Sequence, residues 1–228
     1  MTDVERNEGT VKPVLVWDLP TRLFHWTLVI LVGTSWLTGE LGEMEWHMRS
    51  GIAILSLVLF RLLWGIFGSS TSRFTQFVKA PAAAIAYARG LIAGKPSHSF
   101  GHNPLGGWMV VLLLALLLSQ AGTGLFANDD IFTEGPLYHL VTKSTSDRLT
   151  SIHKLLFDGL LICVALHVSA AVLYLVVKKE NLILPMISGR KKGTALDRQA
   201  PFILRSSLVA AICLAAAAAV VWAILTFA

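Results

Sequence analysis

Apolar residues fall into five long runs along the chain, and polar connections separate the runs. They cover residues 23–41, 51–67, 105–126, 152–177 and 203–227. Each run is near the length of about 20 residues that an α-helix needs to cross a bilayer, and none alternates as the strands of a membrane barrel do. The pattern predicts an all-α membrane protein with five spanning helices, of which the first is the least apolar.

The charged side chains predict how these helices are oriented. Lys and Arg gather before the first run, between the second and third, and between the fourth and fifth, whereas carboxylates outnumber Lys and Arg in the other two connections. Because basic residues accumulate on the cytoplasmic side of a membrane, we expect the N-terminus in the cytoplasm and the C-terminus outside. The net charge of +5 is explained by this topology, so it does not indicate nucleic-acid binding.

The long connection between the second and third runs has two interpretations. Residues 73–94 alternate between apolar and polar side chains and contain several alanines after Pro81. This composition is compatible with an amphipathic helix on the inner membrane surface and equally with an irregular loop.

Histidines in or beside the apolar runs are the main candidate functional residues, because an ionisable side chain within a span is costly and usually functional. His153 and His167 of the fourth run are 14 residues apart, which places them about 40° apart around a helix and ~21 Å apart along it. His25 opens the first run and His47 precedes the second. On the expected topology His47 and His153 share a depth near the outer surface, and His25 and His167 share one towards the cytoplasm.

Two imidazoles at one depth favour a haem iron bound from both sides within a helix bundle. Two haems at different depths would form a path for electrons across the membrane, and an iron with two histidine ligands has no open position for a substrate. Three alternatives remain open. The histidines could be hydrogen-bonded packing residues or part of a proton path, and a zinc site would need three or four ligands close together.

Three basic residues, Arg22, Arg61 and Lys154, occupy positions from which a cation could bind haem propionates. Arg61 lies within an apolar run and could instead extend to the inner membrane surface. Asp158 is about one helical turn from His153 and could orient a ligand, carry a proton from a quinol or face water at the outer boundary.

The other histidines are weaker candidates. His98 and His102 lie in a segment rich in Gly, Ser and Pro, for which we expect a solvated loop. His139 lies in the outer connection between the third and fourth runs, where it is either a surface residue or a contact for a partner.

Several stretches of the chain resemble the bacterial cytochrome b561 family, which includes the b-type cytochrome subunits of nickel–iron hydrogenases. The resemblance covers roughly residues 14–192. Its strongest part is the order of the four histidines. The stretches that carry it are VWDLPTRLFHW (16–26), MEWHMRSG (44–51), FRLLWGIFGS (60–69), GHNPLGGW (101–108) and the helix with His153 and His167.

The resemblance implies a four-helix transmembrane bundle in the bacterial inner membrane that binds two haem b groups. The histidines that match the family's ligands are His25, His47, His153 and His167. We therefore expect a di-haem domain over residues 1–192, followed over 193–228 by a linker and an additional C-terminal spanning helix. That fifth helix departs from the family's four-span core and contains no histidine.

The expected function is that of a respiratory electron carrier. The resemblance implies electron transfer between the quinone pool and a periplasmic redox partner, such as a c-type cytochrome or a hydrogenase. An electron-transfer subunit is favoured over a stand-alone enzyme. One alternative is a self-contained oxidoreductase that takes electrons from a small periplasmic substrate such as superoxide and reduces quinone; another is a non-redox transporter or assembly scaffold.

Overall fold

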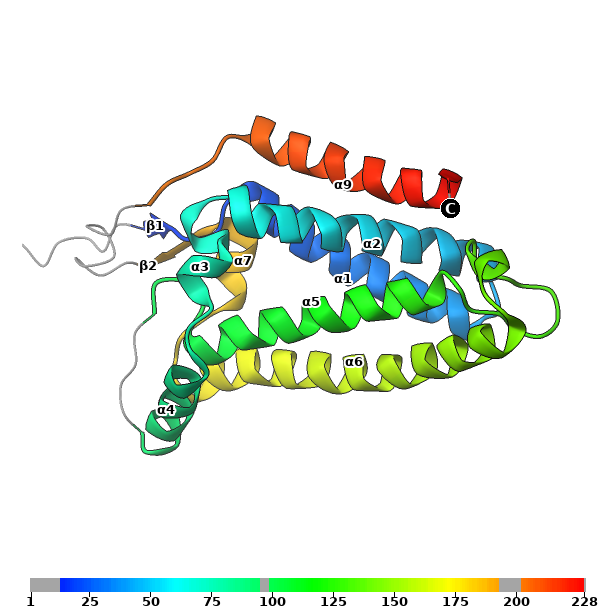
Figure 1. The fold of residues 1–228 in the computed structure, drawn as a ribbon. Coiled ribbons are helices and arrows are strands. Elements are labelled where there is room, and N and C mark those ends of the chain that lie inside the picture. The colour runs from blue at the N-terminus through cyan, green and yellow to red at the C-terminus, as the bar shows by residue number, and fades with distance from the viewer. Residues whose placement is uncertain (1–12, 95–98, 193–201, 228) are drawn as a thin grey trace, which may run out of the picture.

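The computed structural model describes residues 13–94, 99–192 and 202–227, and helices make up most of this part of the chain (Figure 1). A short antiparallel pair of strands, β1 (Pro13–Leu15) and β2 (Arg190–Lys192), joins segments far apart in the sequence. Two 3-10 turns cover Ser70–Ser72 and Tyr138–Leu140. The helices are α1 (Leu19–Glu40), α2 (Met44–Phe67), α3 (Phe74–Phe77), α4 (Pro81–Ile92), α5 (Pro104–Gly124), α6 (Lys143–Val177), α7 (Ile183–Ser188) and α9 (Ser207–Phe227).

The long helices α1, α2, α5 and α6 run up and down as a bundle, and α9 lies along the outer side of α2 (Figure 1). Backbone packing joins α1 to α2, α2 to α5 and α5 to α6. The strands and the short helices α3, α4 and α7 gather at one end, which we call the strand end. The connection between α5 and α6 lies at the opposite end, which we call the loop end.

Among the described residues, four helices are long and apolar enough to cross a membrane: α2, α5, α6 and α9. The protein is therefore a multi-pass membrane protein, and four of the five predicted spans are supported. The first predicted span is also a long helix, α1, but it is less apolar than the other four and does not meet the same criterion.

Polar residues extend two of the helices beyond their apolar runs. The helix α2 begins at Met44 and α6 begins at Lys143, so both start well before the predicted 51 and 152. At the start of α6 the side chain of Thr142 accepts a hydrogen bond from the Thr145 N–H, which satisfies one of the free donors of the first turn. As a result, His47 lies inside α2 and His153 lies ten residues into α6.

The connection over 73–94 contains two helices, α3 and α4, separated by residues 78–80. The segment is therefore helical and not an irregular loop, with a break before Pro81, whereas its place on the inner membrane surface stays a prediction. Proline is favoured in the first turn of a helix and cannot continue a preceding one, which explains why α4 begins there.

A buried carboxylate holds the strand end together. Asp18 is only 1% exposed and caps α1, because one of its oxygens accepts the Thr21 N–H at 2.8 Å. Its other oxygen accepts the Trp64 indole N–H at 3.2 Å and the Ser72 hydroxyl at 3.3 Å. These contacts tie the start of α1 to the end of α2 and to the turn that follows it.

Close packing against backbone predicts the effect of one glycine substitution. A Cβ on Gly107 of α5 would lie 2.6 Å from the Phe77 carbonyl oxygen, whereas one on the adjacent Gly106 would have only an ordinary contact, 3.4 Å from the Asn103 side chain. We expect Gly107→Ala to lower the free energy of unfolding by about 1–3 kcal/mol through overpacking. Gly106→Ala should be neutral or slightly stabilising, because alanine favours a helix more than glycine does.

The measurement is thermal unfolding of the purified protein in detergent, with both variants compared with the unmodified chain. Equal melting temperatures for the two variants would contradict the tight approach of α5 to α3.

Candidate functional site

The four histidines of the sequence prediction lie in two adjacent pairs. His47 of α2 and His153 of α6 approach near the loop end, with ring centroids 6.1 Å apart. His25 of α1 and His167 of α6 approach nearer the strand end, with centroids 6.5 Å apart. The single helix α6 supplies one member of each pair.

Both separations suit one metal ion between two imidazoles. A metal–nitrogen bond of about 2.0 Å on each side, added to ~1.1 Å from each nitrogen to its ring centre, separates two opposed rings by roughly 6 Å. Among the described residues, no group of three or more His, Cys, Asp or Glu side chains could hold a metal ion. The arrangement therefore favours a cofactor that brings its other metal ligands with it, as haem does, over a zinc site.

Backbone carbonyls orient both rings of the loop-end pair. His47 Nδ1 donates to the Ser35 carbonyl at 2.8 Å, and His153 Nδ1 donates to the Gln120 carbonyl at 2.9 Å. A carbonyl oxygen can only accept, so each Nδ1 carries the proton and each Nε2 is unprotonated, with a lone pair that can accept a hydrogen bond or bind a metal. Metal-binding histidines are commonly fixed in this way.

The Gln120 side chain gives a second indication of the same tautomer. Its Nε2 donates to His153 Nε2 at 3.1 Å, which requires that ring nitrogen to be an acceptor. The Gln120 Oε1 atom is buried without a partner among the described residues. Neither Ser35 nor Gln120 was identified from the sequence, because the contacts cross between helices and leave no local pattern.

A cavity of about 390 Å³ surrounds the loop-end pair and is lined by residues of α1, α2, α5 and α6. Trp36 and Phe157 both line it and contact each other, with ring centroids 6.3 Å apart. Gly51 also lines it, and a Cβ there would meet no atom within 4 Å. The cavity is mostly apolar with two imidazoles directed into it, which is the environment that a flat, largely apolar ring requires.

Two other glycines fit closely against the loop-end histidines. A Cβ on Gly39 would lie 3.1 Å from His47 Nδ1, and one on Gly124 would lie 3.0 Å from His153 Cε1. Glycine therefore lets the ends of α1 and α5 approach the two rings and helps to fix their positions.

In the described part of the chain, the strand-end pair has no such carbonyl contacts. His25 Nδ1 is buried and has no hydrogen-bond partner in the described part of the chain. The His25 ring meets the edge of Trp26, with centroids 5.0 Å apart. The His167 side chain is exposed and faces His25.

Buried guanidinium groups lie at the strand end. Arg61 is only 3% exposed, and its Nη1 has no hydrogen-bond partner among the described residues. Its Cζ lies 5.2 Å from the centroid of Phe74 and 5.7 Å from that of Phe77. A buried cation is costly unless its charge is compensated. The Asp18 carboxylate compensates part of the Arg61 charge, and the unpartnered Nη1 fits an anionic group that approaches this end.

The other predicted cations occupy different environments. Arg22 Nη1 donates to the Ile187 carbonyl at 2.5 Å, whereas its Nε is buried without a partner among the described residues. Lys154 and Asp158 both line the loop-end cavity. Arg73, which the sequence analysis did not single out, has a similarly buried Nη2 without a partner in the described chain, and its Nε donates to the Gly68 carbonyl at 2.8 Å.

His102 lies in a loop, as expected, but the expectation that this loop leaves it solvated is wrong. Its ring packs between Trp17 and Phe77, with both centroid distances at 4.6 Å, and its Nδ1 is buried. Burial, followed by the charge of Arg61 and by His167, lowers the pKa of His102 to about 3, so the ring is neutral at physiological pH. His139 is exposed in the turn before α6, and His98 lies outside the described residues.

Comparison with known families identifies the chain. Residues 16–189 match the model of the prokaryotic cytochrome b561 family, and this region contains all four paired histidines and ends before α9. No curated protein and no solved structure matches the sequence. The resemblance seen in the sequence is confirmed: the chain belongs to the prokaryotic cytochrome b561 family, whose members are membrane b-type cytochromes that generally bind haem b and transfer electrons.

Proposed function

We propose that this protein is a di-haem b-type cytochrome that carries electrons between the quinone pool and a periplasmic redox partner, such as a c-type cytochrome or a hydrogenase. The observation that carries the proposal is the presence of two imidazole pairs, 6.1 Å and 6.5 Å apart, at two levels of one helix bundle. Haem b, when bound, supplies a one-electron iron couple at each level.

The ligands we assign are His47 with His153 and His25 with His167. Two ligating imidazoles leave no open coordination position, which favours electron transfer over chemistry at the iron. The carbonyls of Ser35 and Gln120 hold the loop-end rings with Nε2 unprotonated, which is the form that binds a metal. This contact also makes those imidazoles better electron donors to a metal.

The same proposal assigns the cations to haem propionates. Arg61 and Arg22 serve the strand-end haem, because both have buried guanidinium nitrogens without partners among the described residues. Lys154 serves the loop-end haem, since it lines that cavity. Asp158 lies in the same cavity and is available to orient a neighbouring group or to exchange a proton with water.

We further propose that the strand end faces the cytoplasm and that α1 is a fifth span. The basic connections converge at the strand end, and basic loops stay on the cytoplasmic side. Packing of α1 along α2 compensates for its lower apolarity, because its polar positions need not all face lipid. On this basis residues 1–192 form the di-haem domain, and 193–228 add a linker and α9.

The loop-end cavity favours an electron relay over a self-contained enzyme acting on superoxide. Glu40 and Asp158 line it beside Lys154, and carboxylates repel an anionic substrate instead of attracting it. The cavity therefore provides no positive electrostatic field to attract superoxide, as the alternative function of a self-contained quinone-reducing oxidoreductase would require.

Haem content gives the primary test. Purified protein should contain two haem b per chain by the pyridine haemochrome assay, with a reduced-minus-oxidised spectrum of low-spin b haem. His153→Ala should remove the loop-end haem and His167→Ala the strand-end haem, each leaving about one per chain. His139→Ala, at an exposed histidine, is the matched control and should retain both. Fewer than two haems in the unmodified protein, or two in either ligand variant, contradicts the proposal.

Two glycines of α5 test the position of His153. Gly124→Ala should displace the His153 ring, since the new Cβ would lie 3.0 Å from its Cε1, and the loop-end haem should bind more weakly by about 10–100-fold. Gly122→Ala places its Cβ where no atom lies within 4 Å and should behave like the unmodified protein. The measurement is haem retention during titration with apomyoglobin. Equal retention by both variants would contradict the assigned ligand geometry.

Arg61 tests the propionate assignment. Arg61→Gln removes a buried positive charge that favours the reduced, less positive haem, so the midpoint potential of the strand-end haem should fall. The expected decrease is on the order of 60 mV, which is a tenfold change for a one-electron couple. Arg61→Lys retains the positive charge, so the midpoint potential of the strand-end haem should fall less in this variant. Redox titration followed in the visible band measures both, and an unchanged potential in Arg61→Gln would refute the assignment.

A further inference from the structure

The loop that follows α5 displays two apolar side chains to solvent. We call residues 128–134 the acidic loop; a bridge between Asn128 and Glu134 closes it. Ile131 is 73% exposed and Phe132 is 95% exposed. The loop projects beyond the helix ends along the bundle axis (Figure 1), so its tip points away from the sides of the bundle that lipid would cover.

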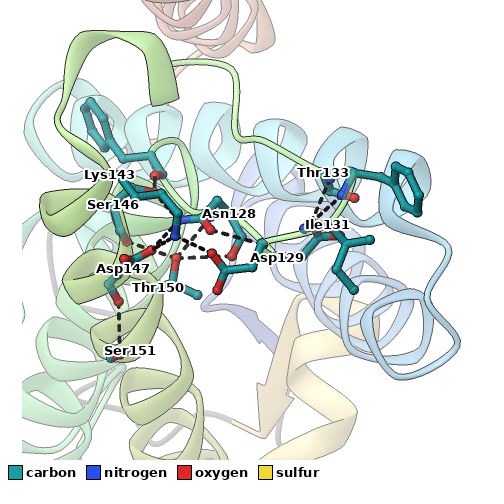
Figure 2. A network of polar contacts seen from close by, with 12 residues as sticks. Asn128, Asp129, Ile131, Thr133, Lys143, Ser146, Asp147, Thr150 and Ser151 are labelled. Atoms are coloured by element: carbon teal, nitrogen blue, oxygen red, sulfur yellow. Dashed lines mark hydrogen bonds and ion pairs between the residues drawn. The ribbon is translucent and has the colours of Figure 1, made fainter.

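The conformation of the acidic loop is held by its own carboxylate. Asp129 Oδ1 accepts three backbone N–H groups, from Ile131 at 2.9 Å, Phe132 at 2.9 Å and Thr133 at 2.8 Å (Figure 2). These bonds, with Thr133 and Ile131 contributing most, hold the pKa of Asp129 far below its usual range. The carboxylate therefore stays ionised, and the two apolar side chains are presented by a preorganised turn.

Hydrogen bonds also anchor the acidic loop to the start of α6. The Asn128 amide donates to Ser146 Oγ at 2.5 Å and to Asp147 Oδ1 at 3.0 Å, and its backbone N–H donates to Thr150 Oγ1 at 3.0 Å (Figure 2). Lys143 donates to both Asp130 and Asp147. The loop is thus fixed to the helix that carries His153, one turn beyond Thr150.

The loop also leads directly to the loop-end cavity. A Cβ on Gly135 would lie 2.5 Å from the Leu125 carbonyl oxygen, so the chain after the loop packs against the end of α5. The next residue, Pro136, lines the cavity that contains His47 and His153. The acidic loop is therefore joined directly to the wall of the cavity that holds this histidine pair.

The charge around the loop is negative. The loop itself carries three carboxylates and no basic residue. At the loop end as a whole, carboxylates outnumber basic side chains by eight to four. The carboxylates are those of Glu40, Glu43, Glu45, Asp129, Asp130, Glu134, Asp147 and Asp158, and the basic residues are Arg49, Lys143, Arg148 and Lys154.

From these observations we infer that the acidic loop is the docking element for a small, basic electron-transfer protein. Phe132 and Ile131 insert into an apolar depression on that protein, and its surrounding Lys and Arg side chains face the loop carboxylates. An aromatic anchor inside a polar rim is the usual composition of a binding hot spot, and a rigid loop loses little entropy on binding. The inference rests on the proposed electron-transfer function and on a periplasmic loop end. Insertion of the loop into lipid is disfavoured, because it would bring three carboxylates to the membrane surface.

Electron transfer to a soluble protein tests the docking element. The haem-loaded, full-length chain is reduced in nanodiscs and mixed with an oxidised small c-type cytochrome of high isoelectric point, and the second-order rate constant is measured by stopped flow. Phe132→Ser should lower this constant about tenfold, the loss of a typical anchor. Leu140→Ser, at an exposed leucine of the same connection, is the matched control and should leave it unchanged. Asp130→Asn combined with Glu134→Gln should reduce its dependence on ionic strength.

The controls separate failure of the docking inference from failure of the proposed function. If unmodified protein lacks two haems or transfers no electrons to a small chemical oxidant, the proposed function fails. If it contains both haems and reduces the oxidant, but Phe132→Ser reduces the c-type cytochrome at the unmodified rate, the docking inference alone is wrong. A spin label at Phe132→Cys, in a Cys163→Ser, Cys213→Ser background, should be accessible to a water-soluble nickel relaxant. Preferential accessibility to oxygen would instead place the loop in lipid and overturn the inference.

Discussion

The constraint on which this structure depends is the spacing of imidazole rings across a helix bundle. Two ring pairs are held 6.1 Å and 6.5 Å apart, although their own attraction is too weak to fix such distances. The surrounding helices must keep each pair apart and opposed. They do so with α6 as a common support, because that helix contributes His153 and His167 on nearly the same side.

The two ends of the bundle meet this constraint by different means. At the loop end, glycines let the ends of α1 and α5 approach the rings, and the carbonyls of Ser35 and Gln120 fix their tautomers. At the strand end, the buried Asp18 carboxylate fastens the start of α1, and therefore His25, to the end of α2. That end contains buried guanidinium groups, whereas carboxylates predominate at the loop end.

The different surroundings of the two histidine pairs affect the reduction potential of a haem bound at each end. A buried positive charge such as Arg61 stabilises the reduced form of a nearby redox centre, whereas hydrogen bonds that make an imidazole more basic stabilise the oxidised form. With haems bound as proposed, both effects would make the potential of the strand-end haem higher than that of the loop-end haem. The acidic loop adds a surface at the opposite end suited to a basic protein, so each end of the chain has its own electrostatic character.

The sequence by itself predicted the four membrane helices α2, α5, α6 and α9 and singled out the four histidines that the fold brings together in two pairs. Long apolar runs can satisfy their backbone only as helices in lipid, and the 14-residue spacing puts His153 and His167 on one side of a helix whatever the tertiary structure. The polar start of α6 could not be predicted from hydropathy, because helix caps and ion pairs extend a helix into residues that are not apolar. The sequence also left open whether residues 73–94 were helical.

Only the tertiary structure decided which polar groups are buried and what they contact. His102 belongs to a segment with the composition of a loop, yet packing between Trp17 and Phe77 removes its ring from water. The carbonyls that orient His47 and His153 belong to every residue type alike, so no residue pattern marks them. Contacts between helices depend on how those helices pack, and for that physical reason they cannot be read from the periodicity of any one of them.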